Sequence, residues 1–169
     1  ERDLRRACYN VRPAVLVVGG TFDAEDCFGA WNLYRALIRQ SPSTPCHLVV
    51  GPWAHGAWRN GGRTLGAFDF GGDATWEYYM EHFEVPFFDH YLRDGNTDAA
   101  APLPAAAVFS SGDNRWHTFG RFLSRGARKL TLYLADGGIL DTRRPTAKIS
   151  ASTYVSDPSD PVPYYEASG

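Results

Sequence analysis

The chain has 169 residues and a formal net charge of −2, and 44% of its residues are hydrophobic. These values are typical of an ordinary globular protein with a sizeable core, and they exclude disordered, fibrous and membrane-spanning classes. The 17 basic residues are scattered and form no positive stripe, so we expect neither nucleic acid nor a membrane surface as a partner.

The first third of the chain predicts a strand, a helix and a second strand. Residues 13–18 (PAVLVV) form an apolar run bounded by proline and glycines, which is typical of a strand buried on both faces. Apolar positions then recur at steps of three and four over 24–40, which predicts an amphipathic helix, and 47–53 (HLVVGPW) is the second strand. Such a unit places both strands parallel in an α/β sheet, whose ligands bind beyond the carboxyl ends of the strands. Residues 21–26 (TFDAED) and 54–56 (AHG) are therefore expected on one rim.

Three carboxylates, Asp23, Glu25 and Asp26, crowd the end of the first predicted strand. Two like charges about 6 Å apart repel by roughly 3 kcal/mol at an effective dielectric of about 20, so the cluster favours binding of a cation or a proton. The simple alternative is helix capping, in which Asp23 accepts a hydrogen bond from the Asp26 amide and the other acids favour the helix dipole. The dipole contributes only about 0.3 to 1 kcal/mol per acid, so both interpretations stay open.

His55 follows the second predicted strand, and a purely structural histidine is the simple alternative for it. An acid at one strand end and a histidine at the next can meet, and a carboxylate behind an imidazole base is how acyl-transfer enzymes hold the correct tautomer. In α/β-hydrolases the chain order is nucleophile, acid and histidine, and Asp23 followed by His55 fits the last two places. No serine lies in a G-x-S-x-G pattern, so we expect the nucleophile upstream of Glu1.

The rest of the chain predicts a surface loop, a second helix and a β module. The Gly-rich segment 56–74 is expected to be a loop, and 75–95 an aromatic-rich helix bent near Pro86 and closed by Gly95. Residues 96–101 have the character of a linker, and 102–169 carry short β-branched runs separated by turns. The three cysteines show no metal-ligand spacing, so we expect no metal site, and Cys27 is interpreted as a buried structural thiol.

Four segments together resemble the α-amino acid ester hydrolases, which stand with the cocaine esterases and Xaa-Pro dipeptidyl-peptidases in one branch of the α/β-hydrolases. They are PAVLVVGGTFDAED at 13–26, LVVGPWAHGAW at 48–58, VPFFDHYLRDG at 85–95 and YVSDPSDPVPY at 154–164. The four follow the family order over essentially the whole chain. One departure is Thr21, where the family commonly has Trp.

The resemblance implies a role for each residue of the rim. Asp23 would be the triad acid and His55 the general base, while Glu25 and Asp26 would bind the α-ammonium group of the substrate. It also implies that 1–95 is the C-terminal part of the catalytic α/β-hydrolase domain, 96–101 a linker and 102–169 the start of a jelly roll. The serine elbow, the oxyanion donor and a third carboxylate would lie outside this chain, and no cofactor is implied.

The predicted function is that of a serine hydrolase fragment acting on esters or amides of α-amino acids. The partner is a small substrate with a free α-amino group, a homo-oligomer is possible, and the resemblance suggests a bacterial periplasmic or secreted protein. One alternative is a plain esterase or Xaa-Pro dipeptidyl-peptidase of the same superfamily. Another is a non-catalytic binding module built around the β part.

Overall fold

The structure, a computed structural model, describes residues 3–72, 74–93, 103–120, 122, 128–146, 151 and 153–161. The chain divides into two compact units, Glu1–Ser124 and Arg125–Gly169. All four predicted site residues lie in the first unit.

The centre of the first unit is a four-stranded sheet in the order β1-β2-β5-β6. β1 (Val15–Gly20) and β2 (Cys46–Gly51) are parallel and are joined by α1 (Cys27–Gln40), which confirms the predicted strand-helix-strand unit. β5 (Ala106–Ser110) pairs parallel with β2, and β6 (Arg115–Phe119) pairs antiparallel with β5. The carboxyl ends of β1, β2 and β5 therefore share one edge of the sheet.

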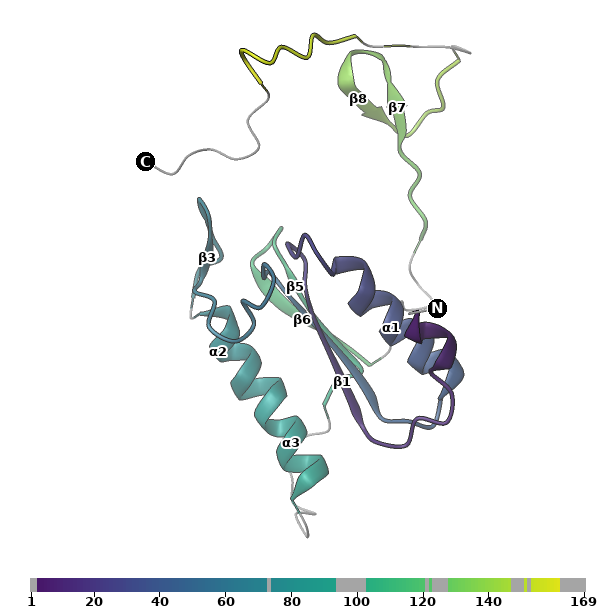
Figure 1. The fold of residues 1–169 in the computed structure, drawn as a ribbon, viewed down its shortest axis with the longest axis vertical. Coiled ribbons are helices and arrows are strands. Elements are labelled where there is room, and N and C mark those ends of the chain that lie inside the picture. Colours follow the sequence, from purple (N-terminus) through teal and green to yellow (C-terminus); the bar gives the residue numbers. More distant parts are fainter. Residues whose placement is uncertain are drawn as a thin grey trace. The chain divides into compact units, whose positions relative to one another are not determined.

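Helices cover both faces of this sheet, with α1 on one side and α2 (Thr75–Tyr79) and α3 (Val85–Leu92) on the other (Figure 1). β2 is buried from both sides because its side chains alternate between the two layers. Leu48 and Val50 pack in the core cluster of α1, whereas Val49 packs in the cluster of the opposite face. The predicted α/β class is confirmed as a mixed α/β fold with a parallel core sheet.

The predicted helix over 75–95 is interrupted one turn before the proline that we expected to bend it. A π-helical turn (η2, Met80–Glu84) separates α2 from α3. Pro86 follows this turn by two residues, inside a helix that continues without a break from α2 to α3, so its missing backbone N–H removes a helical hydrogen bond there. The irregularity expected near Pro86 therefore takes the form of a π turn just before it, and the expected stop at Gly95 lies outside the described residues.

The runs AAAVFS and RWHTF were expected to open the β module, and the structure corrects this assignment. As β5 and β6 they belong to the sheet of β1 and β2, so β2, the α2 to α3 helix and β5 form a second strand-helix-strand unit. A β-type run in the sequence does not specify its partner, and Ala106 and Ala107 show no exposure because helices cover them on both faces. The predicted linker at 96–101 lies outside the described residues.

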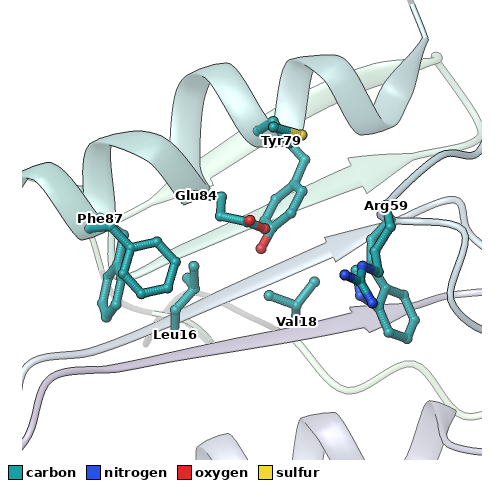
Figure 2. Close-up of a pocket in the computed structure, with 9 residues that line it drawn as sticks. Leu16, Val18, Arg59, Tyr79, Glu84 and Phe87 are labelled. Carbon is teal, nitrogen blue, oxygen red and sulfur yellow. The ribbon is translucent and has the colours of Figure 1, made fainter.

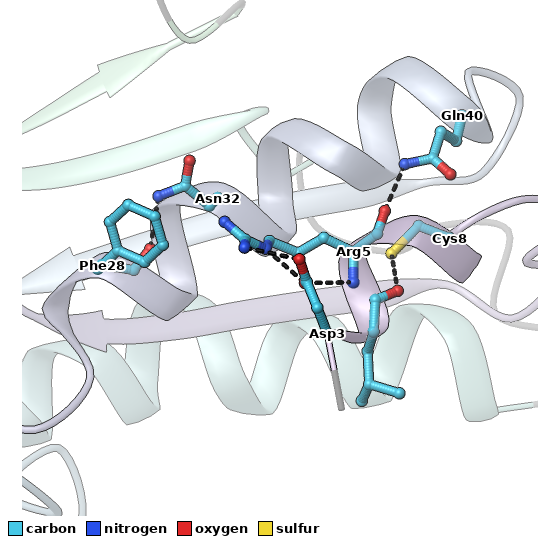
Figure 3. A network of polar contacts seen from close by, with 7 residues as sticks. Asp3, Arg5, Cys8, Phe28, Asn32 and Gln40 are labelled. Carbon is cyan, nitrogen blue, oxygen red and sulfur yellow. Dashed lines mark hydrogen bonds and ion pairs between the residues drawn. The ribbon is translucent and has the colours of Figure 1, made fainter. Parts of the chain in front are cut away.

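A short 3-10 helix (η1, Leu4–Ala7) ties the start of the chain to α1, as Figure 3 shows. The Arg5 guanidinium donates two hydrogen bonds to Asp3, at 2.6 and 2.7 Å, and lies 5.1 Å from the centre of the Phe28 ring. At the other end of α1, the Gln40 amide donates to the Arg5 carbonyl at 2.6 Å. This segment therefore contacts both ends of the helix.

The 56–74 loop and the second unit contribute short hairpins. In the loop, β3 (Thr64–Leu65) pairs antiparallel with β4 (Phe68–Asp69). In the second unit, β7 (Tyr133–Ala135) and β8 (Ile139–Asp141) are joined by a turn (η3, Asp136–Gly138) with two glycines at positive φ. Beyond β6, the predicted jelly roll stays a prediction.

Candidate active site

Asp23 and His55 meet at the carboxyl edge of the sheet, one just after β1 and the other just after β2. Asp23 Oδ2 lies 3.1 Å from His55 Nδ1. The Asp23 side chain is 3% exposed, while that of His55 is 56% exposed. The structure thus brings together the two residues that strand order alone predicted to face each other, with the carboxylate buried behind an accessible imidazole.

The two strand ends are held together by backbone contacts just before this pair. The amide and the hydroxyl of Thr21 both donate to the Gly51 carbonyl, at 2.9 and 2.8 Å, and the Phe22 amide donates to the Trp53 carbonyl at 3.1 Å. Gly20 makes this approach possible, because a Cβ there would lie 2.1 Å from the Trp53 carbonyl oxygen. These contacts set the separation between the turn of Asp23 and the turn of His55.

The two oxygens of Asp23 have different partners. Oδ1 accepts hydrogen bonds from the Glu25 amide at 2.9 Å and the Asp26 amide at 3.1 Å, while Oδ2 faces His55. The hydrogen bond from the Asp26 amide, which the helix-capping alternative predicts, is therefore present together with the contact to His55. It stabilises the turn before the helix, so α1 begins at Cys27 and not at the predicted Ala24.

Hydrogen bonds favour the ionised form of Asp23. Burial by itself raises the pKa of this carboxyl, but the backbone bonds from Glu25 and Asp26 and the contact with His55 outweigh it, so the pKa lies below its ordinary value. The pKa of His55 is raised above its ordinary value, first by the hydrogen bond with Asp23 and then by the charge of Glu25. The imidazole accordingly accepts a proton more readily than a free histidine.

Glu25 and Asp26 are exposed on the same turn, where the sequence placed the acidic cluster. Asp26 is the N-cap residue of α1, but its side chain makes no capping hydrogen bond. Its carboxylate lies over Gly29, whose hypothetical Cβ would be 1.9 Å from Asp26 Oδ1. Neither carboxylate has an ion-pair partner among the described residues, so both are available to a cation from solution.

Sequence reasoning missed Trp58, whose ring contacts His55. The two ring centres are 5.9 Å apart and the planes meet at 77°, an edge-to-face arrangement. The signal that could have identified it is the glycine between them, because Gly56 adopts a φ of +76° that turns the chain back on itself. No described residue forms a hydrogen bond with His55 Nε2, which leaves that nitrogen accessible.

A cleft of about 640 Å³, lined in part by Trp58, lies between β1 and the α2 to α3 helix (Figure 2). Leu16 and Val18 form its floor, and Tyr79 lies beside Glu84 in its wall. Burial, followed by the hydrogen bond with Glu84, raises the pKa of Tyr79 above its ordinary value, so the phenol stays protonated. Asp23 and His55 do not line this cleft.

Other classes of site have little support in the described parts of the chain. Within them, no group of three or more His, Cys, Asp or Glu residues is placed to hold a metal ion, and no helix has the length and apolar character needed to span a bilayer. The cysteines are free. Cys27 is half-buried, not buried as expected, and burial raises the pKa of Cys46 to about 11.

Comparison with known proteins confirms the resemblance that the sequence segments indicate. The chain is 31% identical over 140 residues to cocaine esterase from Rhodococcus sp. (strain MB1 Bresler), a match over 76% of this chain and 23% of that protein. Among solved structures, it is similar to an aminopeptidase from a marine sediment Thaumarchaeota archaeon, at 36% identity and a TM-score of 0.75 over 91% of this chain and 24% of that one. No protein-family model matches the chain.

A second solved structure, of an α-amino acid ester hydrolase, is 35% identical with a TM-score of 0.72 over 88% of this chain and 25% of that one. All three relatives carry the names of hydrolases, so the chain is related to this hydrolase superfamily. The chain spans about a quarter of the length of each of them.

Proposed function

We propose that this chain carries the acid and the base of a serine hydrolase that cleaves esters or amides of α-amino acids. The observation that carries the proposal is the 3.1 Å contact between buried Asp23 and accessible His55 at the carboxyl edge of a parallel sheet. The relatives named above, which are hydrolases, support the same reaction class. The serine nucleophile belongs to a part of the protein outside the printed sequence.

In the proposed mechanism, the serine oxygen attacks the substrate carbonyl while His55 Nε2 takes the serine proton. The tetrahedral intermediate collapses to an acyl-enzyme, and His55 gives that proton to the leaving alcohol or amine. Water then attacks the acyl-enzyme while His55 takes its proton, and the second tetrahedral intermediate releases the carboxylic acid as His55 returns that proton to the serine oxygen. Asp23 keeps the Nδ1 proton facing inward, because its other oxygen is held by two backbone amides.

Glu25 and Asp26 supply the selectivity in this proposal. Both are exposed beside His55, and repulsion between neighbouring carboxylates is relieved by a cation bound between them. A substrate ammonium group provides that cation, and a hydrogen bond to a charged group contributes about 1.5 to 3 kcal/mol. Acyl groups with a free α-amine are therefore preferred.

Replacing Asp23 with Asn in the full-length enzyme tests the reaction class. We expect kcat to fall by orders of magnitude with the fold intact, because an amide in place of the carboxylate favours the wrong tautomer of His55. Steady-state kinetics and circular dichroism on the same preparations measure both quantities. Near-normal turnover in a folded variant would refute the assignment.

The substrate class is tested with an α-amino ester and its des-amino analogue. We expect kcat/KM for the amino ester to exceed that of the analogue, and Glu25→Gln with Asp26→Asn to reduce the difference. Equal kcat/KM values for the two esters in the unmodified enzyme would instead indicate a plain esterase. The triad proposal would survive that result, since it depends on Asp23 and His55.

A further inference from the structure

We infer that Trp58 is a positioning residue for the general base: its indole ring holds the His55 imidazole in the orientation in which Nδ1 faces Asp23 and Nε2 faces outward. This inference rests on the proposed role of His55 as a base. It goes beyond that role because it names a residue that sets how much of the time the base is correctly oriented.

The need for such a residue follows from the exposure of His55. More than half of its side chain is open to solvent, and a single hydrogen bond, at 3.1 Å to Asp23, fixes one ring atom. One contact leaves the ring free to swing about that atom, and water competes for Nδ1. The charged groups that face the ring, Asp23, Glu25 and Asp26, all lie on the turn after β1, so none of them supports the opposite side.

Trp58 provides the second contact. Its ring meets that of His55 edge to face, with centres 5.9 Å apart and planes at 77°, within the range of favourable aromatic pairs. The indole is itself anchored, because Trp58 is half-buried and packs against the core cluster that contains Val49, Trp53 and Tyr79. A ring held by the core on one side can restrain a mobile imidazole on the other.

The backbone between the two residues is arranged to produce this contact. The Ala57 amide donates to the Ala54 carbonyl at 3.1 Å, and the Arg59 amide donates to the Gly56 carbonyl at 3.2 Å. Gly56 belongs to both turns and has a φ of +76°, a conformation that favours glycine over other residues. The two turns bring Trp58, three residues further along, back over the imidazole of His55.

The test is a nitrogen and proton NMR titration of His55 in the full-length protein, with the unmodified protein, Trp58→Phe, Trp58→Leu and Trp58→Met compared. Two quantities are measured: the pKa of His55 and, above that pKa, the tautomer of the neutral ring. Trp116→Leu is the matched control, because Trp116 packs against the same cluster and its ring contacts Trp53, Tyr78, Phe83 and Phe109 instead of His55. Asp23→Asn reports on the acid.

In the unmodified chain we expect neutral His55 to carry its proton on Nδ1, facing Asp23, and Trp58→Phe to preserve this state. Trp58→Leu and Trp58→Met should shift the ring toward the Nε2-protonated form and lower the His55 pKa toward that of Asp23→Asn. Trp116→Leu should change neither quantity. Leu and Met both keep apolar volume without an aromatic ring, so a variant that fails to fold leaves the other to decide.

Each failure has a separate meaning. Suppose that Asp23→Asn alters the tautomer and the pKa of His55, but folded Trp58→Leu or Trp58→Met does not. That result would overturn the role of Trp58 and leave the proposed function standing. An unchanged His55 in Asp23→Asn would overturn the acid-base pair itself. A shift in Trp116→Leu as large as that in Trp58→Leu would reduce Trp58 to a packing residue.

Discussion

Two aspartate-histidine pairs in the first unit look alike by distance and differ in every other respect. At the rim, Asp23 and His55 approach to 3.1 Å; at the turn between β5 and β6, Asp113 and His117 approach to 2.8 Å. The closer pair comes from residues four apart in the chain, and both of its side chains are 47% exposed. The rim pair joins two strands and has a buried carboxylate.

The difference shows why proximity alone does not indicate a catalytic pair. The pKa of Asp113 is lowered mainly by hydrogen bonds from the side chains of Ser110 and His117, which water reaches and replaces, and least by the Arg115 amide. Asp23 depends instead on backbone amides that cannot move away without unfolding the turn. We expect the rim pair to be sensitive to its scaffold and the hairpin pair to be insensitive.

The largest effect on stability is expected from a glycine exchange at each location. Gly20→Ala places a Cβ 2.1 Å from the Trp53 carbonyl oxygen, a backbone atom that cannot give way, and overpacking of this kind costs about 1 to 3 kcal/mol. Gly112→Ala in the hairpin meets nothing closer than Ser110 Oγ at 3.8 Å and should be tolerated. Urea unfolding of both variants measures the contrast, and equal midpoints would remove the argument for a rigid rim.

A smaller loss is expected from Thr21→Val, which removes the hydroxyl that donates to the Gly51 carbonyl at 2.8 Å. A hydrogen bond of this type contributes about 0.5 to 1.5 kcal/mol. Thr21→Ser keeps the donor and is the control, since only the methyl group is lost. If Ser and Val lower the free energy of unfolding equally, the hydroxyl does not hold the two strand ends together.

The rim pair should also make stability depend on pH. Because the folded-state pKa of His55 is raised, its favourable contribution is full below the ordinary histidine value of about 6.5 and is lost as the pH rises through the folded value. Unfolding midpoints of the unmodified chain should therefore fall more between pH 6 and pH 8 than those of His55→Gln. Parallel pH profiles for the two proteins would show that the contact does not stabilise the fold.

The smallest effect is expected from Asp113→Asn. Both partners of this pair are exposed, and an ion pair between exposed side chains contributes little to stability because water competes for the contact. The melting temperature of the chain and the kcat of the full-length enzyme should match those of the unmodified protein. A marked loss of turnover would mean that the hairpin pair, and not the rim pair alone, takes part in the reaction.

Local pattern predicted much of the first unit. The apolar runs at 13–18 and 47–53 predicted two buried parallel strands, and the polar residues after them predicted the shared rim. Boundaries were less predictable, because α1 begins three residues later than its periodicity suggests and a π turn interrupts the next helix. The spacing of apolar residues reveals neither feature. The start of α1 depends on side-chain hydrogen bonds in the preceding turn, and the π turn depends on one extra residue in a helical turn.

Partners distant in the chain were predictable only in part. The sequence assigned the runs that form β5 and β6 to a separate β module, because a β-type run carries no information about which strand it pairs with. Trp58 was not recognised, since its contact with His55 depends on the positive φ of Gly56. The roles proposed for Asp23, His55, Glu25 and Asp26 stay predictions until they are measured.

The sequence by itself determined the order of strands and helix and the residues at the rim, because the spacing of apolar residues and the ends of strands are local properties. It also determined the resemblance to a hydrolase branch. Tertiary structure alone decided that the Asp23 carboxylate is buried while His55 stays open, and that Trp58 lies against the imidazole. Burial and ring contact depend on atoms brought together from separate strands and turns. Such distances arise only when the whole unit packs.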